Sequence, residues 1–446
     1  MNPGKTEIGT FSTRTPPSSQ PDSVRYAGAP RVMARVLGAG ALGLLHARTS
    51  HTPRPAPRLP LPRVAAPGKL SAVPQRGDLL AARPISLVGT HPSLLPASGT
   101  HLTYVSADSR GRLLPTTGAL LRSHRPWQRG PRPLIVFAPS TQGVAPSCDP
   151  SASCAVGIAA RLRPHLDLIM AYEQPVIGLF LASGADVVLT DYPRDPATGT
   201  QLYCEHRAGA AALVDAVRAA RTLGVSEEAP LGVWGFSQGG GSAGALLEDP
   251  PSDCPWPVRA GVVGAPPSRL DEVLRHVDGS LVTGVIAYSL AAFLVDEPAI
   301  QGEVCARLSP AGIAAVEDAR STCAIGAALR CGWRDSSTWT RDGQPLADTL
   351  DDAPALRAAL TRRRLGHTAP TVPVLLWCST HDDVVPPAQV RALRADWEAR
   401  GAQVSWRENS FPRIPGQLGI NHFGPYYRHA VNDAFWLLDH VTKETG

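Results

Sequence analysis

Lysine is almost absent from this 446-residue chain, and methionine is equally rare. Three of each occur, beside 44 prolines and 41 glycines. The formal net charge is +5, but residues 1–70 hold ten basic and two acidic side chains. The remaining residues therefore carry 33 basic and 36 acidic groups. Because this body is nearly neutral, it lacks the basic footprint of a nucleic-acid-binding protein, and we expect no nucleic-acid partner.

The cysteines and histidines lack the spacing of a metal site, and the N-terminal apolar stretch lacks the length of a membrane span. The eight cysteines form no Cys-x-x-Cys pair and no Cys/His cluster with zinc spacing, so we expect no metal. Their even number permits disulfides without indicating the pairing. The apolar stretch Val36–Leu45 has the length of a signal-peptide core and is too short to span a bilayer. We therefore expect export to the extracellular space or cell envelope; the alternative is a short amphipathic or disordered leader.

What the chain does contain, from about residue 80, is an alternation of short apolar runs and helical patterns. Buried strands are predicted at 132–139, 185–191, 231–235, 259–264, 372–377 and 403–406. Helices are predicted at 206–223, 238–248 and 425–442. Strands that alternate with helices favour an α/β fold, with a mostly parallel central sheet flanked by helices on both faces.

Residues 270–365 interrupt this alternation. Several helical patterns follow one another there without intervening strands, and we interpret the stretch as an inserted helical cap. The expected organisation is a disordered leader or signal segment with a Pro-rich linker at 1–75, a first core part at 76–269, the cap at 270–365, and a second core part at 366–446.

The most informative motif is GFSQG at residues 235–239, which fits G-x-S-x-G between a predicted strand and a predicted helix. In that context Ser237 lies on a strained turn as a candidate nucleophile, and the Gln238 N–H becomes one donor of an oxyanion hole. The alternative is a phosphate-binding glycine loop. It lacks the lysine of a P-loop and the spacing of a dinucleotide-binding motif.

A serine nucleophile needs a base and an acid, which follow it along the chain in this type of sheet. Asp382 comes directly after the strand at 372–377 and is the predicted acid, with Asp383 as its rival. His422, before the last predicted helix, is the predicted base. His429 and His440 lie within that helix and are interpreted as structural.

A second oxyanion donor is expected from the loop after the strand at 132–139. Thr141 and Gln142 are both candidates, and the residues alone do not separate them. The alternative is that this polar loop is a plain surface loop.

Taken together, the motifs resemble the secretory lipases, an α/β-hydrolase family of fungi and actinobacteria. The matching strings are TQG at 141–143, CDPS at 148–151, TDYP at 190–193, GFSQGG at 235–240, GAPP at 264–267, DDVVP at 382–386 and NH at 421–422. The resemblance covers roughly residues 95–445. It implies hydrolysis of triacylglycerols or short esters, secretion, and a disulfide from Cys148 to the cap. Asp149, Ser140 and the run 193–196 depart from the family pattern, which leaves the substrate range open.

The expected function is that of a secreted serine hydrolase, a lipase or carboxylesterase acting on small-molecule ester or lipid substrates. Ser237, His422 and Asp382 suffice for an acyl-enzyme mechanism without any cofactor. Acyl transfer to an alcohol and a non-catalytic hydrolase-like binding protein are the alternatives. Cap residues Ile286, Leu290, Phe293 and Leu294 are candidate lining of an acyl pocket, with core packing as the alternative.

Overall fold

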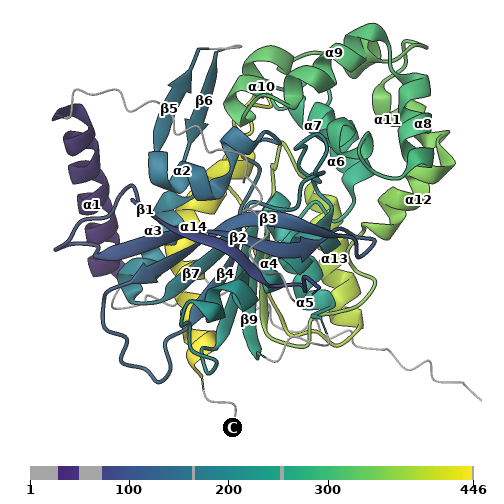
Figure 1. Cartoon of the computed structure of the whole chain (residues 1–446). Coiled ribbons are helices and arrows are strands. Elements are labelled where there is room, and N and C mark those ends of the chain that lie inside the picture. Colours follow the sequence, from purple (N-terminus) through teal and green to yellow (C-terminus); the bar gives the residue numbers. More distant parts are fainter. Residues whose placement is uncertain (1–28, 50–72, 163–165, 252–255, 444–446) are drawn as a thin grey trace, which may run out of the picture.

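The computed structural model describes residues 29–49, 73–162, 166–251 and 256–443 (Figure 1). A nine-stranded sheet forms the centre, in the order β1-β2-β3-β7-β4-β8-β9-β10-β11. The strands along this order are β1 (Leu79–Ile85), β2 (Ala97–Ala107), β3 (Leu113–Ser123), β7 (Asp186–Thr190), β4 (Leu134–Ala138), β8 (Leu231–Phe236), β9 (Val258–Gly264), β10 (Val374–Ser379) and β11 (Val404–Asn409).

The six strands from β7 to β11 pair in parallel, and they are the six predicted from apolar runs. The prediction of a mostly parallel sheet is therefore confirmed. The antiparallel strands β1, β2 and β3 complete one end of the sheet and were not predicted. Strands β2 and β3 mix apolar residues with threonine and serine, and β1 contains Arg83 and Pro84, so all three lack the continuous apolar runs of the central strands.

Helices cover both faces of the sheet, which explains why the central strands are apolar throughout. On one face lie α4 (His206–Thr222), α5 (Gln238–Glu248) and α13 (Pro387–Ala399), and on the other lie α3 (Gln174–Ser183) and α14 (Ile420–Thr442). Strand β4 shows the alternation directly. Val136 belongs to the first core, whereas Ile135 and Phe137 belong to the second.

Residues 29–49 form helix α1 (Ala29–Thr49), within the segment for which we expected a disordered leader. Val32, Val36 and Ala39 recur at helical spacing and are buried against α3 and α14, so one face of this helix packs on the core. The other parts of the expected leader and linker, residues 1–28 and 50–72, lie outside the described residues. Among the described helices, none combines the length and the apolar character needed to cross a membrane.

A group of helices follows β9 and precedes β10, and it lies to one side of the sheet (green in Figure 1). Its members are α6 (Leu270–Val277), α7 (Gly284–Phe293), α8 (Pro298–Arg307), α9 (Pro310–Ala319), α10 (Ala324–Cys331), α11 (Leu346–Asp351) and α12 (Pro354–Arg362). We propose that they form the cap. Cys148, in the loop after β4, forms a disulfide with Cys323 at the start of α10, so the link from Cys148 to the cap is confirmed.

Two small elements lie between β4 and α3. Helix α2 (Pro150–Val156) follows the disulfide-bearing loop, and strands β5 (Ile158–Arg161) and β6 (Asp167–Met170) form a separate antiparallel pair beside α10.

Candidate active site

Ser237 lies at the turn between β8 and α5, with backbone angles φ 58° and ψ −124°. This positive φ is costly for a residue with a side chain and is typical of functional turns. The flanking glycines make the turn possible. A Cβ on Gly235 would lie 2.2 Å from the Gly239 carbonyl oxygen, and a Cβ on Gly239 would lie 1.9 Å from that of Ala138. Helix α5 can therefore lie this close to both β8 and β4 only with glycine at these two positions.

His422 and Asp382 lie side by side although 40 residues separate them. The His422 Nδ1 atom is 2.8 Å from Asp382 Oδ2 and 3.0 Å from Oδ1. The backbone N–H groups of Val384 and Val385 donate to Asp382 Oδ1 at 2.9 and 2.8 Å. Both side chains of the pair are fully buried. This arrangement fixes the carboxylate and orients the imidazole so that Nε2 faces away from it.

Asp383, the rival acid, contacts backbone instead of the imidazole. It accepts hydrogen bonds from the N–H groups of Gly419 and His422 and from the Asn421 side chain, at 3.0, 3.2 and 3.1 Å. A carboxylate at this position caps a helix N-terminus and favours its extension. Helix α14 accordingly begins at Ile420, so His422 lies in its first turn and not in the loop that we expected before it.

The free side of His422 lies in the same cavity as Ser237. Phe236 stacks on the imidazole ring, with ring centroids 4.6 Å apart. The His422 Nε2 atom is buried and has no hydrogen-bond partner among the described residues. Ser237 and His422 both line a cavity of about 70 Å³ with mostly apolar walls. An unpaired imidazole nitrogen beside a strained serine can act as a general base toward its hydroxyl.

The two candidates for the second oxyanion donor differ in position. Thr141 and Gln238 line the cavity together with Ser237. Gln142 points elsewhere: its side-chain oxygen accepts a hydrogen bond from Ser153 Oγ at 2.8 Å, and its carbonyl accepts one from Ala324 N–H at 2.9 Å. The structure therefore brings Thr141 to Ser237, and Gln142 connects the loop to α2 and α10.

The proposed cap contributes an apolar wall of the cavity, through a different face of α7 than we expected. Val285 and Tyr288 line the cavity, one helical turn apart. Ile286, Leu290 and Phe293 are fully buried in the core on another face of the same helix, and Leu294 packs against it. Helical spacing identified a buried face here, but both faces of α7 are apolar and the pattern could not assign the cavity to one of them.

In the described part of the chain, one group of side chains of the types that bind metal ions lies close together, namely Cys148, Asp167 and Cys323. The two sulfur atoms are bonded to each other, and Asp167 accepts the N–H groups of Cys323 and Gly326. Because both cysteines are bonded in the disulfide, neither offers a thiolate ligand, and this group does not fit a metal ion.

Comparison with known proteins adds the family. The profile described as secretory lipase matches residues 163–445, well over half of the chain. The chain belongs to the secretory lipase family.

Two curated relatives illustrate the range of this family. The chain is 25% identical over 352 residues to "Probable inactive lipase MT1628" of Mycobacterium tuberculosis, covering 77% of this chain and 75% of the relative. It is 24% identical over 283 residues to "Secreted triacylglycerol lipase LIP5" of Malassezia furfur, covering 61% and 70%. Family membership supports a lipase-type hydrolase that acts on small-molecule lipids, and the family's name agrees with an extracellular location.

Solved structures agree with the fold of this chain. Candida antarctica lipase A is 15% identical, with a TM-score of 0.66 and coverage of 81% of this chain and 83% of that one. The rice cell wall degrading esterase LipA from Xanthomonas oryzae is 20% identical, with a TM-score of 0.65 and coverage of 82% and 99%. At these identities the likeness establishes the α/β-hydrolase fold.

Glu173 is a buried acid next to the loop after β4, and the sequence analysis did not identify it. Its Oε2 accepts the Ser140 N–H at 2.8 Å, and Tyr426 Oη donates to Oε1 at 3.4 Å. Burial raises the pKa of Glu173 to about 8, and the hydrogen bond from Ser140 only partly offsets this. In the sequence Glu173 is merely an acidic residue before an apolar helix, a common pattern at helix N-termini.

The raised pKa of Glu173 predicts a specific pH dependence of stability. The unfolded chain releases this proton near pH 4.5, whereas the folded chain retains it to about pH 8. The stability linked to this proton is therefore complete below pH 4.5 and is lost as the pH rises to about 8. As the pH rises from 5.5 to 9, the wild type should lose stability that Glu173→Gln retains. We expect the difference in unfolding free energy between the two proteins to shift in favour of the variant by up to roughly 3 kcal/mol. Thermal unfolding at both pH values checks this. Parallel pH dependences of the two proteins would contradict it.

Proposed function

We propose that this chain is a secreted serine hydrolase that cleaves carboxylic esters, acylglycerols among them, through Ser237, His422 and Asp382. The observation that carries the proposal is the shared cavity. It joins the strained serine to an imidazole whose Nδ1 is held by a buried carboxylate and whose Nε2 is unpaired among the described residues. The family match, the lipase-type fold and the disulfide all agree with a secreted ester hydrolase.

In the proposed reaction His422 Nε2 takes the proton of Ser237 as its Oγ attacks the ester carbonyl. The carbonyl oxygen becomes an oxyanion that the Gln238 N–H and the Thr141 region stabilise. The C–O bond to the alcohol then breaks, and the alcohol leaves with the proton from His422. Water, deprotonated by His422, attacks the acyl-enzyme, and the carboxylic acid departs as Ser237 regains its proton.

The main competing proposal is a hydrolase-like protein without activity. A relative with 25% identity carries the name "Probable inactive lipase", which keeps this alternative open. The three proposed triad positions argue against this alternative, because Ser237, His422 and Asp382 are residues able to perform acyl transfer. Acyl transfer to an alcohol would use the same residues with a different second nucleophile.

The size and character of the cavity predict a preference for short acyl chains. Its volume is about 70 Å³ and its walls are mostly apolar. Each buried methylene contributes about 0.8 kcal/mol until the cavity is filled. We expect kcat/KM for p-nitrophenyl esters to rise from acetate to butyrate and to fall for palmitate.

Initial rates of nitrophenol release, measured across this series, check the prediction. A preference for palmitate would contradict the assignment of this cavity as the acyl site. The absence of release above background for every ester would contradict the proposed function itself. Parallel detection of the free acid and of an added alcohol's ester distinguishes hydrolysis from acyl transfer.

A further inference from the structure

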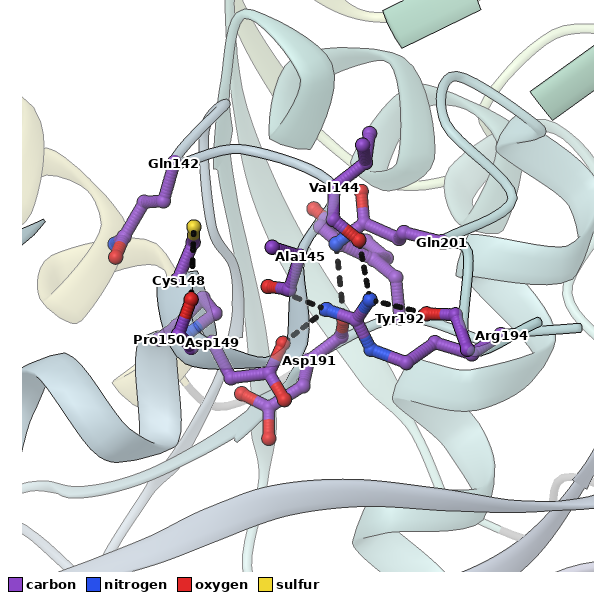
Figure 2. Close-up of polar contacts among 12 residues, drawn as sticks. Gln142, Val144, Ala145, Cys148, Asp149, Pro150, Asp191, Tyr192, Arg194 and Gln201 are labelled. Carbon is purple, nitrogen blue, oxygen red and sulfur yellow. Dashed lines mark hydrogen bonds and ion pairs between the residues drawn. The ribbon is translucent and has the colours of Figure 1, made fainter. Parts of the chain in front are cut away.

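The proposed triad does not account for a dense set of contacts beside it. Two loops make these contacts: the β4 loop, residues 139–149, and the post-β7 loop, residues 191–205 (Figure 2). The β4 loop carries Thr141, and the serine turn that carries Gln238 lies beside it. The two donors of the proposed oxyanion hole thus come from separate segments. Contacts between these segments must fix their positions relative to one another.

Arg194, from the post-β7 loop, holds the far end of the β4 loop. Its guanidinium donates to the carbonyl oxygens of Val144 and Ala145 and forms an ion pair with Asp149 (Figure 2). It also donates to the Gly199 carbonyl at 2.9 Å, within its own loop. The ion pair is largely buried on both sides, so water screens it little.

Two tyrosines hold the near end of the β4 loop. Tyr192 Oη donates to the Pro139 carbonyl at 2.5 Å. Tyr203 Oη lies 2.8 Å from Thr141 Oγ1, and both residues line the cavity. The β4 loop is therefore attached to the post-β7 loop at both of its ends.

Gln201, in the post-β7 loop, contacts both the serine turn and the β4 loop. Its side-chain oxygen accepts from Gln238 Nε2 at 2.9 Å, and its own Nε2 donates to the Asp191 carbonyl at 3.1 Å. Its backbone N–H donates to the Val144 carbonyl in the β4 loop at 3.4 Å. The residue is 3% exposed, so water cannot readily replace these partners.

We propose that Gln201 is a positioning residue that keeps the two halves of the oxyanion hole in register. It acts through the side chain of Gln238, whose backbone N–H is one of the two proposed oxyanion donors, and through Val144 in the β4 loop. The proposal rests on the proposed function. Removing one oxyanion donor outright reduces kcat by about 10²–10³-fold. Misplacing donors without removing them has a smaller effect, so we expect a fall of roughly 10–50-fold.

A purely structural Gln201 would behave differently. Loss of a buried hydrogen bond lowers stability wherever it occurs, but it does not act selectively on kcat. Gln389 provides the matched control, because it is equally buried and its side-chain oxygen also bridges two segments, accepting from Arg269 N–H at 2.8 Å. It lies on α13 and does not line the cavity.

The test is a double-mutant cycle in the full-length protein, with p-nitrophenyl butyrate as substrate. The variants are Gln201→Ala, Gln238→Ala and the double variant, with Gln389→Ala as control. We expect Gln201→Ala to lower kcat by roughly 10–50-fold with KM changed less than about 2-fold. The double variant should be no slower than the slower single variant, because Gln201 acts through the Gln238 side chain. Gln389→Ala should keep its kcat even if its melting temperature falls.

Several outcomes would overturn the proposal: an unchanged kcat in Gln201→Ala, a defect confined to KM, or multiplicative losses in the double variant. If Gln201→Ala does not fold, Gln201→Met, which keeps the side-chain volume, replaces it with the same expectations. Failure of the proposed function is separable. In that case the wild type itself would show no turnover and no labelling of Ser237 by a fluorophosphonate.

Discussion

Ser237→Ala is expected to lower kcat for p-nitrophenyl butyrate by roughly 10⁴–10⁶-fold and to leave the fold intact. The serine oxygen forms the acyl-enzyme bond, and alanine offers no atom that can replace it. The backbone at this position has φ 58°, a strain that serine and alanine bear alike, so the exchange should hardly affect stability.

Initial rates and a thermal melt of the same preparation check this expectation. Ser183→Ala is a suitable control, because Ser183 is a helix-end serine of α3 that donates to the Leu179 carbonyl at 2.8 Å and does not line the cavity. Turnover by Ser237→Ala within about 10-fold of the wild type, or a loss of activity in the control as large as in Ser237→Ala, would contradict the role of Ser237.

Asp382→Asn is expected to lower kcat by roughly 10⁴-fold. The carboxylate accepts the Nδ1 proton at 2.8 Å, which leaves Nε2 as the unprotonated base facing the cavity. An asparagine can present an N–H to Nδ1 instead, which favours the wrong tautomer. It also cannot stabilise the imidazolium that forms when His422 takes the serine proton.

Asp383→Asn provides the comparison that separates the two neighbouring acids. Asp383 accepts three hydrogen bonds at the start of α14, so its neutralisation should lower the melting temperature while kcat falls much less than in Asp382→Asn. Rate and melting measurements on both variants decide the assignment. A larger loss of kcat in Asp383→Asn would reverse it.

The serine turn and the parallel sheet could be predicted from sequence because short local patterns encode them. Continuous apolar runs mark strands buried on both faces, and Gly235 and Gly239 around Ser237 mark a turn that tolerates no Cβ at either glycine. Between Asp382 and Asp383 the sequence could only state a preference. Adjacent carboxylates differ solely in the direction of their side chains, which the turn at Val384 and Val385 sets.

Contacts between distant segments set the remaining features of the site, and local patterns do not report them. Glu173 and Gln201 act on loops that lie far from them in sequence, through Ser140 and Gln238 respectively. Thr141 and Gln142 have similar local character, and the contacts of Gln142 with Ser153 in α2 and with Ala324 in α10 are what direct it away from the cavity. Helix α7 is apolar on several faces, so its periodicity could not identify Val285 and Tyr288 as the lining.

The fold alone does not decide between an active and an inactive family member, because the same scaffold hosts both kinds of protein. One relative of this chain is named a secreted triacylglycerol lipase and another a probable inactive lipase. The decision rests on whether Ser237 is nucleophilic, which reactivity reports more directly than similarity does.

The most direct measurement is covalent labelling with a fluorophosphonate probe, followed by peptide mapping. Such probes phosphonylate a serine only when a neighbouring base activates it. The account predicts one adduct per chain, on the peptide that contains Ser237, with no adduct in Ser237→Ala and slow labelling in Asp382→Asn. A folded wild-type protein that gains no adduct at Ser237 would contradict the central claim and favour a non-catalytic binding protein.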